Sequence, residues 1–270
     1  IAMLQSLGKK GIIKDLVADY GQVIIDECHH LSAFSFEQVL KQVKAKCVLG
    51  LTATPIRKDG HHPIIIMQCG PIRFRVDDRQ QAAIRPFDHV VIPRTTQFVL
   101  PDNCDVSMMH EVYTALAVDE GRNDLIFDDI LYTLDEGRSP ILLTERTSHL
   151  EYFAQRLEGF AKNIIVLRGG MGKKQRQALE DKINCIPDHE ERVLLATGRY
   201  IGEGFDDARL DTLFLVMPIS WKGTLHRLHH NKHEVQIYDY LDINVPLLNR
   251  MYDKRLQGYR NMGYEIRIAK

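Results

Sequence analysis

The chain has 270 residues, of which 44% are hydrophobic and 26% charged, a composition typical of ordinary globular proteins with about two domains. Its formal net charge is −1, so composition alone does not point to a polyanionic partner. No run approaches the ~18 consecutive apolar residues that a membrane span requires, and the first residues lack the order of a signal peptide. The five cysteines, an odd number without a Cys-x-x-Cys spacing, indicate reduced intracellular thiols.

Strand-like and helical patterns alternate along the chain. Short apolar runs bounded by turn residues predict buried strands of a mostly parallel sheet, at residues 23–25, 47–51, 141–143, 164–167, 193–196 and 212–216. Apolar residues at spacings of three and four predict helices, at residues 113–134, 148–160 and 173–183. This alternation predicts an α/β fold.

The alternation breaks between Pro71 and Pro101, where the segments IRFRV, HVVIP and TQFVL predict extended or antiparallel structure. The predicted parts are a first domain at residues 1–85, a connector at 86–106, a second domain at 107–245 and a basic helical tail at 246–270. Because the first part contains only two clear central strands, we expect it to be the rear part of a domain that opens before Ile1.

The sharpest local feature is the segment QVIIDECHH at residues 22–30, in which an apolar strand delivers Asp26 and Glu27 to its C-terminal end. In open α/β sheets, ligands bind at that edge. One carboxylate there can hold Mg²⁺ through water, and its neighbour can accept a proton from water that attacks a γ-phosphate. An Asp-Glu pair can equally form the first turn of a following helix, so the pair alone leaves both interpretations open.

The next predicted strand runs directly into Thr52-Ala53-Thr54-Pro55. Two hydroxyl groups therefore fall at the same predicted sheet edge, where they can hydrogen-bond to the acidic pair and sense its state. The alternative is that Thr52 and Thr54 only terminate a strand before a proline.

These segments resemble motifs II and III of superfamily 2 DEAD/DEAH-type helicases, especially the branch of XPB-like helicases and restriction-enzyme motor subunits. Farther along, PILLTER at residues 140–146 resembles motif IV, and LLATG at 194–198 with GEGFD at 202–206 resembles motif V. The resemblance implies an α/β protein with two RecA-like parallel-sheet domains, the first incomplete at its N-terminus. It also implies that ATP binds in the cleft between them.

By the same resemblance, Asp26 coordinates Mg²⁺ through water, Glu27 is the general base for ATP hydrolysis, and His29 couples the nucleotide to domain movement. The resemblance further implies a nucleotide-sensing or cleft-lining role for Thr52, Thr54, Gly204 and Asp206.

The resemblance also implies that Thr197 contacts the nucleic-acid backbone. Arg146, Arg168 and the turn at Gly169-Gly170 are candidate phosphate contacts in the second domain. The alternative is that these are surface arginines and an ordinary strand-to-helix turn.

Two departures from the family pattern stand out. Motif I, a phosphate-binding P-loop, is absent, and we expect it upstream of Ile1. At motif VI only Arg227 matches, as the second of two family arginines, and the segment for the first is missing between Leu225 and His226.

We therefore expect an ATP-dependent nucleic-acid helicase or translocase that uses ATP and Mg²⁺. DNA is favoured over RNA as its partner, because the branch that the chain resembles contains DNA motors. We expect a cytoplasmic or nucleoid-associated location, no membrane contact, and possible flanking domains or subunits. An RNA helicase of the same superfamily stays open, as does a non-catalytic nucleic-acid-binding module, because this chain by itself lacks the P-loop.

Overall fold

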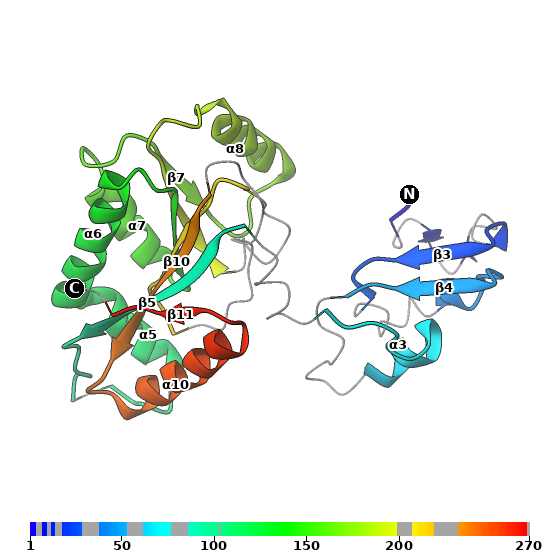
Figure 1. The fold of residues 1–270 in the computed structure, drawn as a ribbon, viewed down its shortest axis with the longest axis horizontal. Coiled ribbons are helices and arrows are strands. Elements are labelled where there is room, and N and C mark those ends of the chain that lie inside the picture. Colours follow the sequence, from blue (N-terminus) through cyan, green and yellow to red (C-terminus); the bar gives the residue numbers. More distant parts are fainter. Residues whose placement is uncertain are drawn as a thin grey trace. The chain divides into compact units, whose positions relative to one another are not determined.

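The structure is a computed structural model, which describes residues 1–3, 7–9, 12–13, 18–28, 38–52, 62–76, 86–102, 104–198, 207–218 and 232–268. The chain divides into two compact units, unit 1 at Ile1–Val76 and unit 2 at Asp77–Lys270 (Figure 1).

Unit 1 is built on two parallel strands, β3 (Gln22–Ile25) and β4 (Cys47–Gly50), as the two apolar runs predict. A short antiparallel ribbon of β1 (Gly8–Lys9) and β2 (Ile12–Ile13) and the helix α3 (His62–Cys69) accompany them. The core of this unit is small and consists of Ile25, Cys28, Leu40 and Ile65, with partly buried neighbours.

Unit 2 contains a seven-stranded sheet in the order β11-β5-β10-β9-β6-β8-β7, and every neighbouring pair is parallel. Its strands are β5 (Asp88–Thr96), β6 (Pro140–Thr144), β7 (Ile164–Leu167), β8 (Val193–Thr197), β9 (Thr212–Leu215), β10 (Glu234–Asp242) and β11 (Glu265–Ile266). All residues of β6 and β9 are buried, because helices cover both faces of the sheet.

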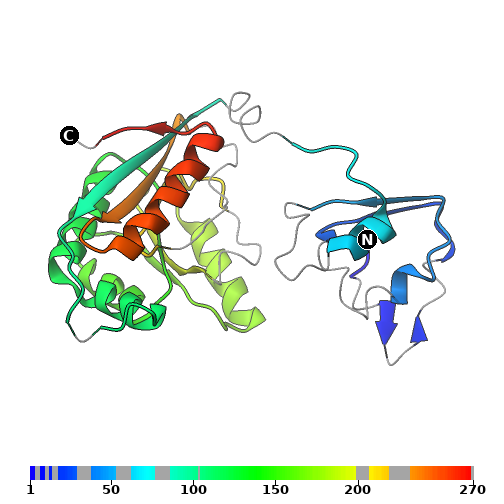
Figure 2. The same cartoon turned by 90° about the horizontal axis from the view of Figure 1, so that it is seen from below.

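Within the described residues, the helices of unit 2 are α5 (Met109–Val118), α6 (Glu120–Asp135), α7 (Thr147–Arg156), α8 (Lys173–Cys185) and α10 (Pro246–Asn261). Apolar residues of α6 and α7 pack on one face of the sheet, whereas α8 and α10 contribute to the core on the other face. Figure 2 shows α10, in red, against β10, in orange. The α/β fold with a large parallel sheet agrees with the sequence prediction.

We expected residues 86–106 to form a connector with extended or antiparallel segments, and the extended backbone is present, but as a strand of the large sheet. β5 instead lies inside the sheet, parallel to β10, and the register pairs Asp88 with Glu234. The partner strand lies far along the chain, so no local pattern could indicate this pairing. Likewise the expected basic tail packs as α10 on the sheet and ends in β11, which pairs with β5.

The single helix expected at residues 113–134 is two helices that meet at Asp119. Oδ1 of Asp119 accepts a 2.7 Å hydrogen bond from the backbone nitrogen of Arg122, which makes Asp119 the N-cap of α6. A capping aspartate inside a continuous apolar pattern therefore starts a new helix.

Candidate functional site

The C-terminal end of β3 forms an acidic corner, made of Asp26 and Glu27. Both residues are exposed, and Oδ1 of Asp26 accepts a 2.9 Å hydrogen bond from the backbone nitrogen of Glu27. Glu27 has a φ of 49°, in the left-handed region that few residues other than glycine adopt. This tight turn presents two carboxylates to solvent at the edge of a parallel pair of strands.

Backbone hydrogen bonds join the acidic corner to the end of β4. The nitrogen of Leu51 donates to the carbonyl of Ile25 at 2.8 Å, and the nitrogen of Cys28 donates to the carbonyl of Leu51 at 2.9 Å. Thr52, which is half-buried, follows at the same edge. The structure thus brings the acidic pair and Thr52 to one edge of unit 1.

Five residues of the predicted site lie outside the described residues. They are His29, Thr54, Gly204, Asp206 and Arg227.

Two predicted residues, Thr197 and Gly169, lie with Thr144 at the C-terminal ends of three neighbouring strands in unit 2, a group that we call the polar edge. Thr144 lies in the segment that resembles motif IV but is not itself a predicted site residue. Thr144 at the end of β6 pairs in register with Thr197 at the end of β8. Gly169, just after β7, donates its backbone N–H to Oγ1 of Thr197 at 3.3 Å. The polar edge thus gathers Thr144, Thr197 and Gly169 on one side of the sheet.

Arg146 and Arg168, the two candidate arginines beside the polar edge, differ in the contacts that fix their side chains. Arg168 is half-exposed, and its guanidinium lies 3.3 Å from the exposed carboxylate of Glu151. Such a surface ion pair contributes little to the stability of the protein. Arg146 is half-buried; its backbone nitrogen donates to Oγ1 of Thr144 at 3.2 Å, and its guanidinium donates to the backbone carbonyl of His110. Arg168 is therefore freer to meet an incoming phosphate than Arg146.

A buried hydrogen-bond network, not predicted from the sequence, supports Thr144. His149 lies with Nδ1 3.2 Å from Oγ1 of Thr144 and Nε2 2.9 Å from Oδ1 of Asn123. Nδ2 of Asn123 in turn donates to the carbonyl of Ala117 at 3.0 Å. Burial lowers the pKa of His149 to about 3, so the imidazole is neutral at ordinary pH. Nε2–H therefore donates to Asn123, and Nδ1 accepts from the Thr144 hydroxyl.

One sequence signal for this network existed. His149 precedes Phe153 by four residues, so it shares the buried side of α7 with the apolar stripe. A polar residue at such a position indicates a hydrogen-bond partner inside the protein, but the spacing does not identify Asn123 on another helix.

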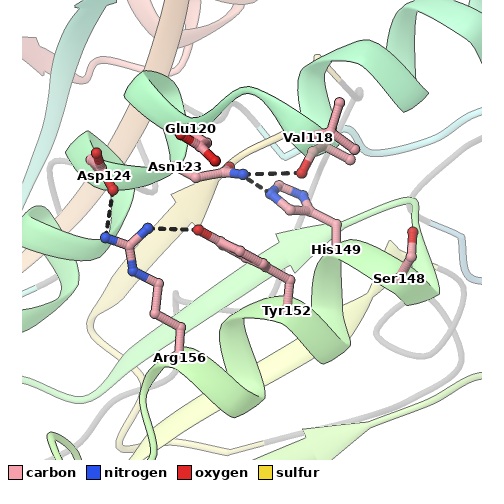
Figure 3. A pocket seen from close by; sticks show the side chains of 9 residues that line it. Val118, Glu120, Asn123, Asp124, Ser148, His149, Tyr152 and Arg156 are labelled. Atoms are coloured by element: carbon pink, nitrogen blue, oxygen red, sulfur yellow. Dashed lines mark hydrogen bonds and ion pairs between the residues drawn. The ribbon is translucent and has the colours of Figure 1, made fainter.

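An open hollow of about 470 Å³ adjoins His149 (Figure 3). Over its rim, the guanidinium of Arg156 donates to the hydroxyl of Tyr152 at 2.6 Å and to Asp124 at 2.5 Å. Because the guanidinium of Arg156 is already paired, it has little capacity left to bind an anion in the hollow.

The chain is similar to known proteins over nearly its whole length. Residues 1–57, which include the acidic corner, match the family described as "Type III restriction enzyme, res subunit". A protein of Acanthamoeba polyphaga mimivirus that is named as an ATP-dependent RNA helicase is 23% identical over 275 residues, covering 98% of this chain and 52% of that protein.

Two solved helicase-type structures share the fold. T4 UvsW matches with a TM-score of 0.51 at 13% identity, over 94% of this chain and 54% of its own. S. cerevisiae Dbp5, solved with RNA and ADP–BeF3, matches with a TM-score of 0.53 at 12% identity, over 92% of this chain and 59% of its own. The chain resembles superfamily 2 helicases in sequence and fold.

The helicase resemblance extends over nearly the whole chain, yet the chain spans only about half the length of the curated relatives it matches. Within the described residues, no helix combines the length and the hydropathy that a bilayer span requires.

Proposed function

We propose that this chain is the motor part of an ATP-dependent helicase or translocase. The observation that carries the proposal is the acidic corner, where a parallel strand pair brings Asp26, Glu27 and Thr52 to one sheet edge. The similarity to helicases over 98% of the chain supports it. We assign unit 1 to the rear part of a first RecA-like domain and unit 2 to the second.

The acidic corner fits Mg²⁺–ATP chemically, because hard cations prefer carboxylate and water oxygens and Asp26 is exposed. Bound Mg²⁺–ATP supplies the γ-phosphate and the charge that neutralises it during transfer. In this proposal Asp26 holds the cation through water, and a carboxylate oxygen of Glu27 accepts the proton of the attacking water. The hydroxyl of Thr52, at the end of the neighbouring strand β4, responds when Glu27 gains this proton.

The polar edge of unit 2 is the proposed contact for the nucleic-acid backbone. A threonine hydroxyl and an exposed backbone turn suit phosphate oxygens, and Arg168 adds a cation whose partner among the described residues is the exposed Glu151. Such contacts position a strand without reading its sequence, as a translocating motor requires.

Glu27→Gln in the full-length protein tests the catalytic proposal. The amide keeps the size of the side chain but cannot accept the proton, so we expect ATP to bind while the rate of hydrolysis falls at least about 100-fold. Equilibrium binding of labelled ATP and steady-state phosphate release measure the two effects separately.

Glu158→Gln provides the control, because Glu158 is an exposed glutamate of unit 2 and is not one of the candidate site residues. We expect it to hydrolyse ATP at the wild-type rate. Full activity in Glu27→Gln would contradict the assignment of the general base.

DNA is the favoured partner, since the family matched by residues 1–57 is described as a restriction-enzyme subunit. The alternative is RNA, which the name of the mimivirus relative favours. Stimulation of ATP hydrolysis by duplex DNA and by RNA of equal length, measured at several salt concentrations, distinguishes the two.

A further inference from the structure

Two cysteines from distant parts of unit 1 meet beside the acidic corner. Cys28 follows Glu27 directly and is only 2% exposed, whereas Cys69 ends α3 and is half-buried. Their thiols lie close enough to form a hydrogen bond with each other. The pair belongs to the small core of this unit.

Gly50 on β4 makes room for this approach. A Cβ atom built on Gly50 would lie 2.9 Å from Sγ of Cys28 and 2.9 Å from Sγ of Cys69, closer than real Cβ contacts. Both sulfur atoms therefore approach a backbone position, Gly50, that carries no side chain. The main chain of Cys28 is fixed as well, because its nitrogen donates to the carbonyl of Leu51 at 2.9 Å.

We infer that Cys28 and Cys69 are the site of a reversible disulfide, formed by exchange with a low-molecular-weight disulfide such as oxidised glutathione. The bond would link the last residue of α3 covalently to the residue after the acidic corner. The alternative is a pair of small apolar side chains that only fill the core. The close approach of the two sulfur atoms favours the first interpretation, because core filling does not require it.

The exchange proceeds in two steps. The thiolate of Cys69, the less buried of the two residues, attacks one sulfur of oxidised glutathione; the glutathione S–S bond breaks and one reduced glutathione leaves. The thiolate of Cys28 then attacks Sγ of Cys69, forms the protein disulfide and expels the second glutathione. The two thiol protons end on the two glutathione thiols, and the two electrons lost by the cysteine pair reduce the glutathione disulfide.

Burial raises the pKa of Cys69 to about 11, so few thiolates of this residue are present at neutral pH. We therefore expect the pair to stay reduced in a reducing compartment and to exchange faster at alkaline pH. We expect oxidised glutathione to reach the exposed thiols of Cys47 and Cys185 more easily than it reaches the pair.

The test uses a chain in which only the pair remains, Cys47→Ser/Cys104→Ser/Cys185→Ser, incubated with oxidised glutathione at about pH 9. We expect the intact mass to fall by two hydrogens, a peptide that joins residues 28 and 69, and full reversal by dithiothreitol. A stable glutathione adduct on Cys69, or two thiols that are still alkylated after denaturation, would overturn the inference. Neither outcome depends on ATP hydrolysis, so the proposed function is tested separately.

Three further variants in the same background check the order of steps and the geometry. Cys28→Ser should trap one glutathione on Cys69, whereas Cys69→Ser should take up none because Cys28 is buried. Gly50→Ala should slow disulfide formation about tenfold, since its methyl group pushes the sulfur atoms apart. Glutathione on Cys28 in the Cys69→Ser variant, or an unchanged rate in Gly50→Ala, would contradict the proposed geometry.

Discussion

At the residue scale, His149 shows how one buried side chain can set the response of the protein to pH. The residue is 1% exposed, and burial lowers the pKa of its imidazole from 6.5 to about 3. Between these two values the unfolded chain binds a proton that the native protein does not bind. The free energy of unfolding therefore falls as the pH falls from the upper value towards the lower one.

From this difference we predict that His149 alone costs the wild-type protein about 2 kcal/mol of stability on going from about pH 7 to about pH 5. His149→Gln removes the titrating group and should show a stability that depends less on pH by this amount, whatever its stability at neutral pH. Urea unfolding at the two pH values measures the difference.

His110→Gln is the matched control, because His110 is an exposed histidine on the neighbouring helix α5. Because His149 stays in place in this variant, the loss of stability that its protonation causes at low pH should remain. If His149→Gln behaves in the same way as this control, the imidazole of His149 is not kept neutral by burial.

At the element scale, a buried ion pair fastens α10 to β10. Asp239 is fully buried and accepts two hydrogen bonds from the guanidinium of Arg255, at 2.8 Å and 2.7 Å. The hydroxyl of Tyr259, one turn later on α10, donates to the same carboxylate at 2.9 Å. One strand carboxylate thus sets the position of the helix along the sheet.

We predict that Asp239→Asn lowers the free energy of unfolding by about 3 to 5 kcal/mol, because it leaves the cation of Arg255 buried without a counter-charge. Glu151→Gln, which breaks the exposed pair with Arg168, should cost less than about 1 kcal/mol. Chemical denaturation of both variants gives the comparison, and equal costs would show that burial does not control the strength of these pairs.

Secondary structure that depends on local pattern was predictable, and pairing between distant segments was not. The apolar runs at residues 141–143 and 193–196 became β6 and β8, each extended by one residue or two, because a strand buried on both faces needs a continuous apolar run. The extended backbone of β5 was expected, but its parallel pairing inside the large sheet was not, because its partner β10 lies far along the chain.

The same distinction applies to the candidate sites. Asp26 and Thr52 could be placed together from sequence, since each follows a strand and the ends of neighbouring parallel strands meet at one edge. The pairing of Cys28 with Cys69 and of His149 with Asn123 joins side chains from separate elements. No periodicity records such contacts, so only the packed structure reveals them.

At the scale of the whole molecule, the two units differ in how much apolar surface they bury. In unit 2, two cores lie on the two faces of the seven-stranded sheet, and β6 is buried throughout. In unit 1, Ile24 of β3 is 60% exposed and Leu49 of β4 is 45% exposed, although parallel strands are usually covered on both faces. Burial of apolar surface is the main stabilising term, so unit 1 should open more easily.

We predict that backbone amides of β3 and β4 exchange with solvent deuterium roughly 100-fold faster than those of β6 and β8, equivalent to about 3 kcal/mol in opening free energy. Mass spectrometry of peptides from each strand measures the rates in the native protein. β7, an edge strand of the larger sheet, is the control, because its backbone also lies at a sheet edge. If β3 exchanges only as fast as β7, the edge position explains the result; if β3 exchanges faster, the small core of unit 1 is the cause.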